Sequence, residues 1–170
     1  SISMFVSFKP IVNQNFVLNQ VIDLIIESDY MKDLQLRGAY FEPDIVKVTI
    51  STSTLSLLKN FNQKYFTEDN IPYKIFQKNK LYYMTLNFPW EGDKMEGDIR
   101  ALKTLADKTV FSNRVSISVT NNEFELQGRS SDIISYLLQM ADNGLINKFS
   151  LLVQHLESGG FYIKIRKNKI

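Results

Sequence analysis

Residues 115–167 read VSISVTNNEFELQGRSSDIISYLLQMADNGLINKFSLLVQHLESGGFYIKIRK, and the order of elements in this segment is the pattern for the whole chain. Two short runs in which apolar and polar residues alternate come first, a helical run follows, and two more alternating runs close the stretch. Turn residues separate the paired runs at Asn121-Asn122 and at Ser158-Gly159-Gly160. The pattern predicts the order strand, strand, helix, strand, strand.

The same order is found once earlier, between residues 34 and 88. Glu42-Pro43-Asp44 supplies turn chemistry between the first two predicted strands, and a helix then starts among Ser51, Thr52 and Ser53, any of which can act as its N-cap. Two further strands follow, YKIFQ (residues 73–77) and LYYMTLNF (residues 81–88). An amphipathic helix precedes each copy, one from Asn13 onward and one over residues 98–108.

The two copies align in pattern although few residues are identical. At an offset of 79 residues, three alternating apolar positions fall on three others: Tyr82, Met84 and Leu86 on Phe161, Ile163 and Ile165. Pro89, Gly92 and Gly97 mark a linker between the copies. The sequence therefore predicts a tandem repeat with a first domain over residues 1–90 and a second over residues 91–170.

Each half reads helix, strand, strand, helix, strand, strand. Four strands with one apolar face and two helices on that face form a two-layer α+β sandwich, and strand alternation leaves the opposite sheet face polar. About 80 residues is small but sufficient for such a unit. The expected fold class is thus α+β, with two tandem two-layer sandwiches that shield each other's sheet edges or helices.

Composition narrows the function. Of the 170 residues, 44% are hydrophobic and the formal net charge is only +2, which is too weak and too evenly spread to indicate a nucleic-acid partner. The absence of cysteine excludes disulfides, thiolate nucleophiles and zinc held by cysteine. No run approaches the roughly 18 apolar residues that cross a bilayer. Because Ser1 is not a natural initiator and no signal peptide follows it, we expect a fragment whose upstream part, including any membrane segment, lies outside this sequence.

The motifs of catalysis and of cofactor binding are missing. His155 is the only histidine, it lies in an apolar strand, and a serine–histidine–aspartate triad lacks the G-x-S-x-G elbow that presents the serine. No glycine pattern forms a phosphate loop. The amides after Gly128 could hold an anion, but an ordinary helix start with Ser130 or Ser131 as N-cap is the favoured interpretation. We therefore predict no enzyme activity, no catalytic residues, no metal and no cofactor.

Two features are compatible with binding. Tyr83 is predicted on the sheet face opposite its apolar neighbours, where RNA-recognition sheets stack bases, although ordinary packing is the simpler interpretation. Strand 149–156 is apolar on both faces, which suits burial against the other half or against a partner chain. The basic end formed by Lys164, Arg166, Lys167 and Lys169 is expected to be a solvated face. The candidate partner-interface residues are Leu137, Leu138, Leu152 and Leu156.

Residues 124–166 resemble the periplasmic domains of type IV pilus and type II secretion platform proteins of the PilN, PilO, GspL and GspM families. In those families an apolar strand ends in Leu-x-Gly, and a small polar residue, a helix with a double apolar stripe and two closing strands follow. Leu126-Gln127-Gly128, Ser130-Ser131 and Leu137-Leu138 stand where that pattern would place them. Residues 31–61 are similar to the same module, without the Leu-x-Gly.

This resemblance implies a ferredoxin-like fold for each half. It also implies a non-enzymatic scaffold in the periplasmic part of a bacterial inner-membrane protein. Such a scaffold forms homodimers or binds sister inner-membrane platform proteins, and a pilin or pseudopilin is a further candidate partner. Contact with the membrane would come only from a segment missing in this fragment, and no nucleic acid is expected. Tandem units depart from the usual single domain. The alternative is a ligand- or RNA-binding α+β module.

Overall fold

A computed structural model describes residues 14–65, 73–90, 95–109 and 115–168, without the side chains of residues 14 and 61–65. Over these residues the chain is an α+β protein with one eight-stranded antiparallel sheet and four α-helices. The predicted order of elements is confirmed in both halves. The first half contains α1 (Gln14–Tyr30), β1 (Gln35–Phe41), β2 (Ile45–Thr52), α2 (Leu55–Tyr65), β3 (Tyr73–Lys78) and β4 (Leu81–Pro89). The second half contains α3 (Ile99–Thr109), β5 (Ser116–Val119), β6 (Glu123–Gly128), α4 (Ser130–Asp142), a 3₁₀ turn η2 (Ile146–Lys148), β7 (Phe149–His155) and β8 (Phe161–Lys167).

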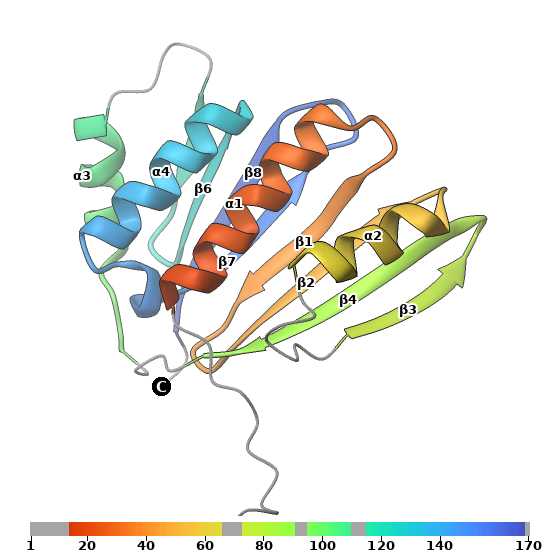
Figure 1. The fold of residues 1–170 in the computed structure, drawn as a ribbon. Coiled ribbons are helices and arrows are strands. Elements are labelled where there is room, and N and C mark those ends of the chain that lie inside the picture. Colours follow the sequence, from red (N-terminus) through yellow and green to blue (C-terminus); the bar gives the residue numbers. More distant parts are fainter. Residues whose placement is uncertain (1–13, 66–72, 91–94, 110–114, 169–170) are drawn as a thin grey trace, which may run out of the picture.

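The sheet order is β3-β4-β2-β1-β7-β8-β6-β5. If the strands of each half are numbered along the chain from one to four, both halves have the order 3-4-2-1. The first strand of the first half, β1, pairs antiparallel with the third strand of the second half, β7, and this pairing joins the halves into one sheet (Figure 1). Strand β7, which corresponds to the predicted strand 149–156, therefore lies beside the other half, while Leu152 and Leu156 on its second apolar side are only half-buried.

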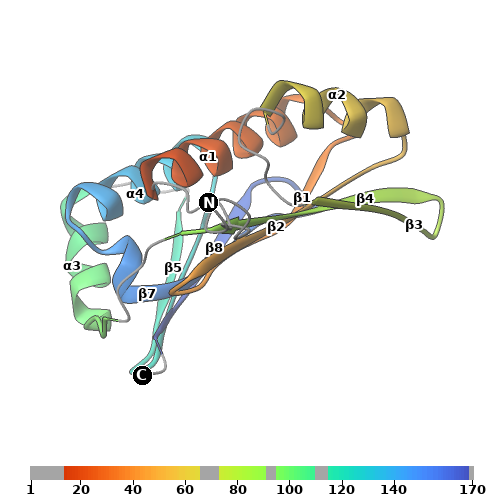
Figure 2. The ribbon, with the colours of Figure 1, turned by 60° about the horizontal axis from the view of Figure 1, so that its bottom comes forward.

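All four helices pack on one face of the sheet and leave the opposite face without a helical cover (Figure 2). Most helix-side positions of the central strands are apolar and buried, in one continuous core that runs through both halves. Helix α1 contacts β1 of its own half as well as β7 and α4 of the other, so it lies across the junction. The two halves thus share a helix layer as well as a sheet.

Local chemistry explains the turns. Asn79 and Lys80 both have positive φ angles, 51° and 65°, which is the geometry of a two-residue type I′ hairpin between β3 and β4. In β1 the register with β2 shifts between Leu36 and Gly38, so Arg37 is a bulge residue. Leu36 and Ala39 therefore both face the core, although simple alternation would place them on opposite faces.

Two predicted helix starts are wrong in detail. Ser51 and Thr52 belong to β2, and α2 begins only at Leu55, because the Asp33 carboxylate holds the side chains of Thr52, at the end of β2, and of Ser53, in the connection to the helix. At α4 the residue in the N-cap position is Arg129, with extended backbone and no side-chain cap bond. Ser130 and Ser131 already lie in the helix.

Some predictions fall outside the described residues. They are the structure of residues 1–13, the central part of the linker (residues 91–94) and the basic residue Lys169. The division into domains at residue 90 stays a prediction. None of the helices within the described ranges is long and apolar enough to cross a membrane.

Candidate interaction surface

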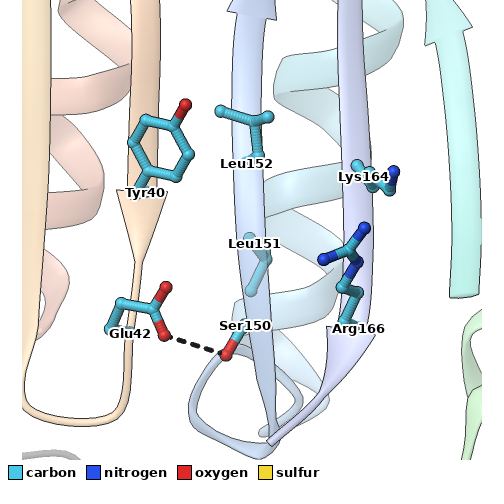
Figure 3. A pocket seen from close by; sticks show the side chains of 7 residues that line it. All are labelled: Tyr40, Glu42, Ser150, Leu151, Leu152, Lys164 and Arg166. Atoms are coloured by element: carbon cyan, nitrogen blue, oxygen red, sulfur yellow. Dashed lines mark hydrogen bonds between the residues drawn. The ribbon is translucent and has the colours of Figure 1, made fainter. Parts of the chain in front are cut away.

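The uncovered sheet face has a hollow where the two halves meet (Figure 3). Its volume is about 250 Å³, and β1, β7 and β8 supply its walls. Because β1 comes from one half and β7 and β8 from the other, neither half forms this hollow alone. We call the following residues the junction hollow: Tyr40, Glu42, Ser150, Leu151, Leu152, Lys164 and Arg166.

The floor of the junction hollow is apolar. Tyr40 is a direct cross-strand partner of Leu152, and its side chain is 43% exposed. Gly38 makes room for the ring, since a Cβ atom at that position would lie 2.9 Å from Tyr40 Cε2 and 3.3 Å from Leu152 Cδ1. A glycine beneath an aromatic ring on a strand lets the ring lie flat along the sheet. The Tyr40–Leu152 pair thus forms a solvent-exposed apolar patch at the middle of the open face.

The rim of the hollow is polar and carries both signs of charge. Ser150 Oγ lies 3.2 Å from Glu42 Oε2 and 3.0 Å from Asn168 Oδ1, and its hydroxyl can donate to either oxygen. Arg166 Nε donates to Glu123 Oε1 at 2.8 Å. A second hollow of about 300 Å³ lies beside the first and shares Glu42, Ser150 and Arg166 with it.

Lys164 is held by two carboxylates of β6. Its Nζ lies 3.6 Å from Glu123 Oε2 and 3.8 Å from Glu125 Oε1.

Burial, assisted by the hydrogen bond to Glu125, raises the pKa of Tyr162 to about 12, so this phenol is neutral at physiological pH. An apolar floor with a balanced, hydrogen-bonded rim is the arrangement that protein contacts use.

The four predicted interface residues do not form one surface. Leu137 is fully buried on the inner side of α4, so its side chain belongs to the core and cannot contact a partner. Leu138 is 42% exposed on the outer side of α4. Leu152 and Leu156 are half-buried, and Leu152 lines the open sheet face. Because α4 covers the other face of the sheet, Leu138 and Leu152 would meet different partners.

Tyr83 lies on the open face, as predicted, and is half-buried there. Phe76 of β3 stacks on it with ring centroids 5.2 Å apart and an interplanar angle of 7°. From the direction of β1, the guanidinium carbon of Arg37 lies 5.7 Å from the centroid of the Tyr83 ring. Tyr83 thus has neighbours from strands on both of its sides, and stacking of a base would have to displace one of them.

The structure brings His155 near Asp29, but not in the order that a catalytic triad needs. Ser130 Oγ donates to Asp29 Oδ2 at 2.8 Å, so the serine contacts the acid and not the imidazole. His155 stacks on Phe161 with centroids 4.5 Å apart, and its buried Nδ1 atom has no hydrogen-bond partner among the described residues. Desolvation lowers the pKa of His155, against a weaker opposing effect of the Asp29 charge.

The loop from Gly128 to the start of α4 borders another open hollow. Ser116, Arg129 and the Gly159-Gly160 turn line it. Asp132 lies in the first helical turn, where its carboxylate would repel an anion bound to the helix amides. Within the described part of the chain, no group of three or more histidine, aspartate or glutamate side chains could hold a metal ion.

No family model and no curated protein sequence matches this chain. Sequence patterns missed Tyr40 and Glu42, which the bulge at Arg37 places beside the second half. The sequence carries no signal for this surface, because alternation counted from Leu36 places Tyr40 in the core.

Proposed function

We propose that this chain is a non-enzymatic structural protein that acts through protein–protein contacts. The observation that supports this most directly is the β1–β7 pairing, since two halves with the same strand order associate through their sheet edges. A unit that binds its own relative in this way is suited to building larger assemblies. In this proposal the chain is a scaffold in the inner-membrane platform of a type IV pilus or a type II secretion system, located in the periplasm.

The finer fold assignment belongs to the same proposal. We propose that each half is a ferredoxin-like unit whose six elements begin with a helix. The ferredoxin-like order is strand, helix, strand, strand, helix, strand. If the first strand of that order is moved to the end, the order becomes helix, strand, strand, helix, strand, strand, as in each half here. The two halves would then be tandem copies of one unit, divided near residue 90.

The junction hollow supports a protein partner better than a small ligand. It opens on the uncovered face of the sheet, whereas small-molecule sites are concave and enclose most of the ligand surface. Tyr40 offers an exposed aromatic anchor, and Glu42 and Arg166 offer opposite charges on the rim. We propose that the chain binds a second copy of itself and the sister platform proteins, and we assign the junction hollow to the sister proteins, with a pilin or pseudopilin as a further partner.

Sedimentation-velocity ultracentrifugation tests the scaffold role. The chain is run over a range of concentrations, alone and mixed with the periplasmic domains of candidate platform proteins. We expect a concentration-dependent dimer, a mixed complex, or both. A chain that stays monomeric at all concentrations and binds none of the candidate platform proteins would contradict the proposal.

Two variants assign the contact to a face of the molecule. Tyr40→Asp alters the open sheet face, and Leu138→Asp makes a similar change on the outer side of α4. If the mixed complex depends on the junction hollow, only Tyr40→Asp weakens it, and loss through Leu138→Asp alone would place the contact on the helices. Circular dichroism of both variants confirms that they remain folded.

A further inference from the structure

The two end strands of the sheet carry half of the large hydrophobic side chains that the described residues expose. β3 and β5 stand at opposite ends of the sheet, and every residue of both strands is exposed (Figure 2). Ten large hydrophobic side chains are exposed among the described residues, and five of them lie on these two strands. Those five are Tyr73, Ile75, Phe76, Ile117 and Val119. Exposed apolar edges are templates for pairing with another strand.

The internal junction shows how two such edges fit together. At that junction the first strand of one half, β1, pairs with the third strand of the other half, β7. Among the described strands, the two edges left free are the first strand of the second half, β5, and the third strand of the first half, β3. The free edges are therefore the same two kinds of strand that already pair inside the chain.

The strand ladders give the equivalent positions on β3 and β7. β4 and β8 align at the offset of 79 residues, so Met84 is equivalent to Ile163. Ile75 pairs with Met84, and Val153 pairs with Ile163. Ile75 on the free edge thus occupies the position that Val153 occupies at the junction.

The same reasoning applies to β5 and β1. Val119 pairs with a residue of β6 that in turn pairs with Ile165 of β8. In the same way, Ala39 pairs with a residue of β2 that in turn pairs with Leu86 of β4, and Leu86 is equivalent to Ile165. Val119 therefore occupies the position of Ala39, and Ala39 is the residue that pairs with Val153 at the junction.

We propose that β5 of one copy of this chain pairs antiparallel with β3 of a second copy, with Val119 opposite Ile75, so that the sheet continues from chain to chain. This inference rests on the proposed scaffold role and names its partner and its surface. The contact is heterologous, because it joins two different edges. Each dimer therefore keeps one free β3 edge and one free β5 edge. Further copies can add to these edges unless the assembly closes into a ring.

Side-chain chemistry agrees with this register. On the helix side, Val119 would meet Ile75, and two apolar side chains would leave solvent together. On the open face, Ser118 would lie opposite Phe76, and β5 brings no charged side chain against Lys74 or Lys78 of β3. Glu125 lies one strand further in, opposite Ser118, on the same face as these lysines. The edge lysines disfavour β3–β3 pairing, in which they would meet like charges.

Cysteine cross-linking tests the register, because the chain contains no cysteine of its own. Chains with Val119→Cys and chains with Ile75→Cys are mixed and oxidised. The two positions lie at opposite ends of eight strands, about 34 Å apart along a flat sheet, so a disulfide between them must join two copies. We expect several-fold more disulfide dimer in the mixture than in either variant alone, and a ladder of dimers, trimers and larger species from the double variant.

The control pair is Ile26→Cys with Leu138→Cys, which places cysteines at two other exposed hydrophobic positions on helices. Equal cross-linking of the control pair and the edge pair would overturn the inference. A predominance of Val119→Cys or Ile75→Cys self-dimers would also overturn it, in favour of symmetric edge pairing.

A charge variant gives a second readout without oxidation. Ile75→Lys should abolish self-association in the ultracentrifuge, whereas Ile26→Lys, which makes the same change at an exposed position of α1, should leave it intact. Equal effects of the two variants would contradict edge pairing. If the edge pair does not cross-link but the chain still binds platform proteins, this inference fails and the proposed function stands. If the chain neither cross-links through its edges nor binds platform proteins, both this inference and the proposed function fail.

Discussion

Tyr40 of β1 lies directly opposite Leu152 of β7, and this pair spans the only strand pairing that joins the two halves within the described residues. Two side-chain bonds reinforce the same pairing. Gln35 Nε2 donates to the His155 carbonyl oxygen at 2.7 Å, and Gln154 Nε2 donates to the Arg37 carbonyl oxygen at 3.0 Å. The junction is thus held by a short ladder, by an apolar cross-strand pair and by amide side chains that reach over it.

The Tyr40–Leu152 contact should couple the halves energetically. Cross-strand aromatic–aliphatic pairs contribute about 0.2–1 kcal/mol beyond alanine pairs. We expect Tyr40→Ala and Leu152→Ala to lower the free energy of unfolding, with a coupling energy in that range in a double-mutant cycle measured by urea denaturation. The pair Leu152→Ala and Leu138→Ala, on opposite faces of the molecule, should be additive. Additivity at the junction as well would show that Tyr40 and Leu152 do not stabilise each other.

Asp33 should make the fold sensitive to acid. Its carboxylate accepts hydrogen bonds from the backbone N–H of Ser53 at 3.0 Å, from the Ser53 hydroxyl, and from the hydroxyls of Thr52 and Thr54. These bonds, led by that of the Ser53 N–H, lower the pKa of Asp33 from 3.8 to about 2.

The sign of the Asp33 effect follows from this pKa. Because the folded-state value lies below the unfolded one, the carboxylate contributes its stability above pH 3.8, and this contribution is lost as the pH falls towards 2. Asp33→Asn should cost about 1 kcal/mol at neutral pH, as loss of a helix cap does. It should also flatten the pH dependence of stability below pH 4. Asp142→Asn, an exposed control, should change the free energy of unfolding by less than about 0.5 kcal/mol.

Gly97 should tolerate no side chain. A Cβ atom there would lie 2.3–2.9 Å from three atoms of the Phe149 ring, which is itself 1% exposed. The ring cannot move without disturbing the core beneath η2, so Gly97→Ala should destabilise the protein by about 1–3 kcal/mol in urea denaturation. Glu96→Ala, at the exposed neighbouring position, should be close to neutral. A neutral Gly97→Ala would mean that Phe149 has room to shift.

The sequence predicts the order of elements well because alternation and helical spacing are local. Spacing also separates Leu137 from Leu138, since the buried residues Ile133, Tyr136, Leu137 and Met140 form one helical stripe. Alternation fails at β1, where the bulge at Arg37 reverses the parity between Leu36 and Ala39. Any pattern that ignores the bulge points Tyr40 into the core.

The pairing of β1 with β7 lies beyond what the sequence predicts. Alternation says which side chains share a face, but it does not say which strand lies next to which. The β1–β7 pairing involves residues more than 100 positions apart and only three cross-strand Cα pairs. No turn fixes its register, which is held by the packing of α1 over both halves and by the amide side chains that cross the junction. The junction hollow and the identity of the free edges both depend on this contact and could not be predicted from the sequence.

His155 should make the fold less stable in mildly acidic solution. Desolvation lowers its pKa below the ordinary value of 6.5, and the charge of Asp29 offsets this only in part. Near pH 6 the unfolded chain therefore binds more protons than the folded chain, so the free energy of unfolding rises with pH until the unfolded imidazole is neutral. Stability should fall as the pH drops from about 7 through 6.5 and towards the folded pKa.

His155→Gln isolates this contribution because His155 is the only histidine in the chain. The variant should remove the slope of stability between pH 5 and 7, measured by urea denaturation at several pH values, and should leave the acid response of Asp33 below pH 4 unchanged. The Phe161 ring stacks on the imidazole, so some stability is lost with the contact at every pH, and the slope rather than the absolute value is diagnostic. An unchanged slope in the variant would assign the pH dependence to other groups. A slope of opposite sign in the wild type would mean that Asp29 outweighs desolvation and that His155 is protonated more readily in the folded chain.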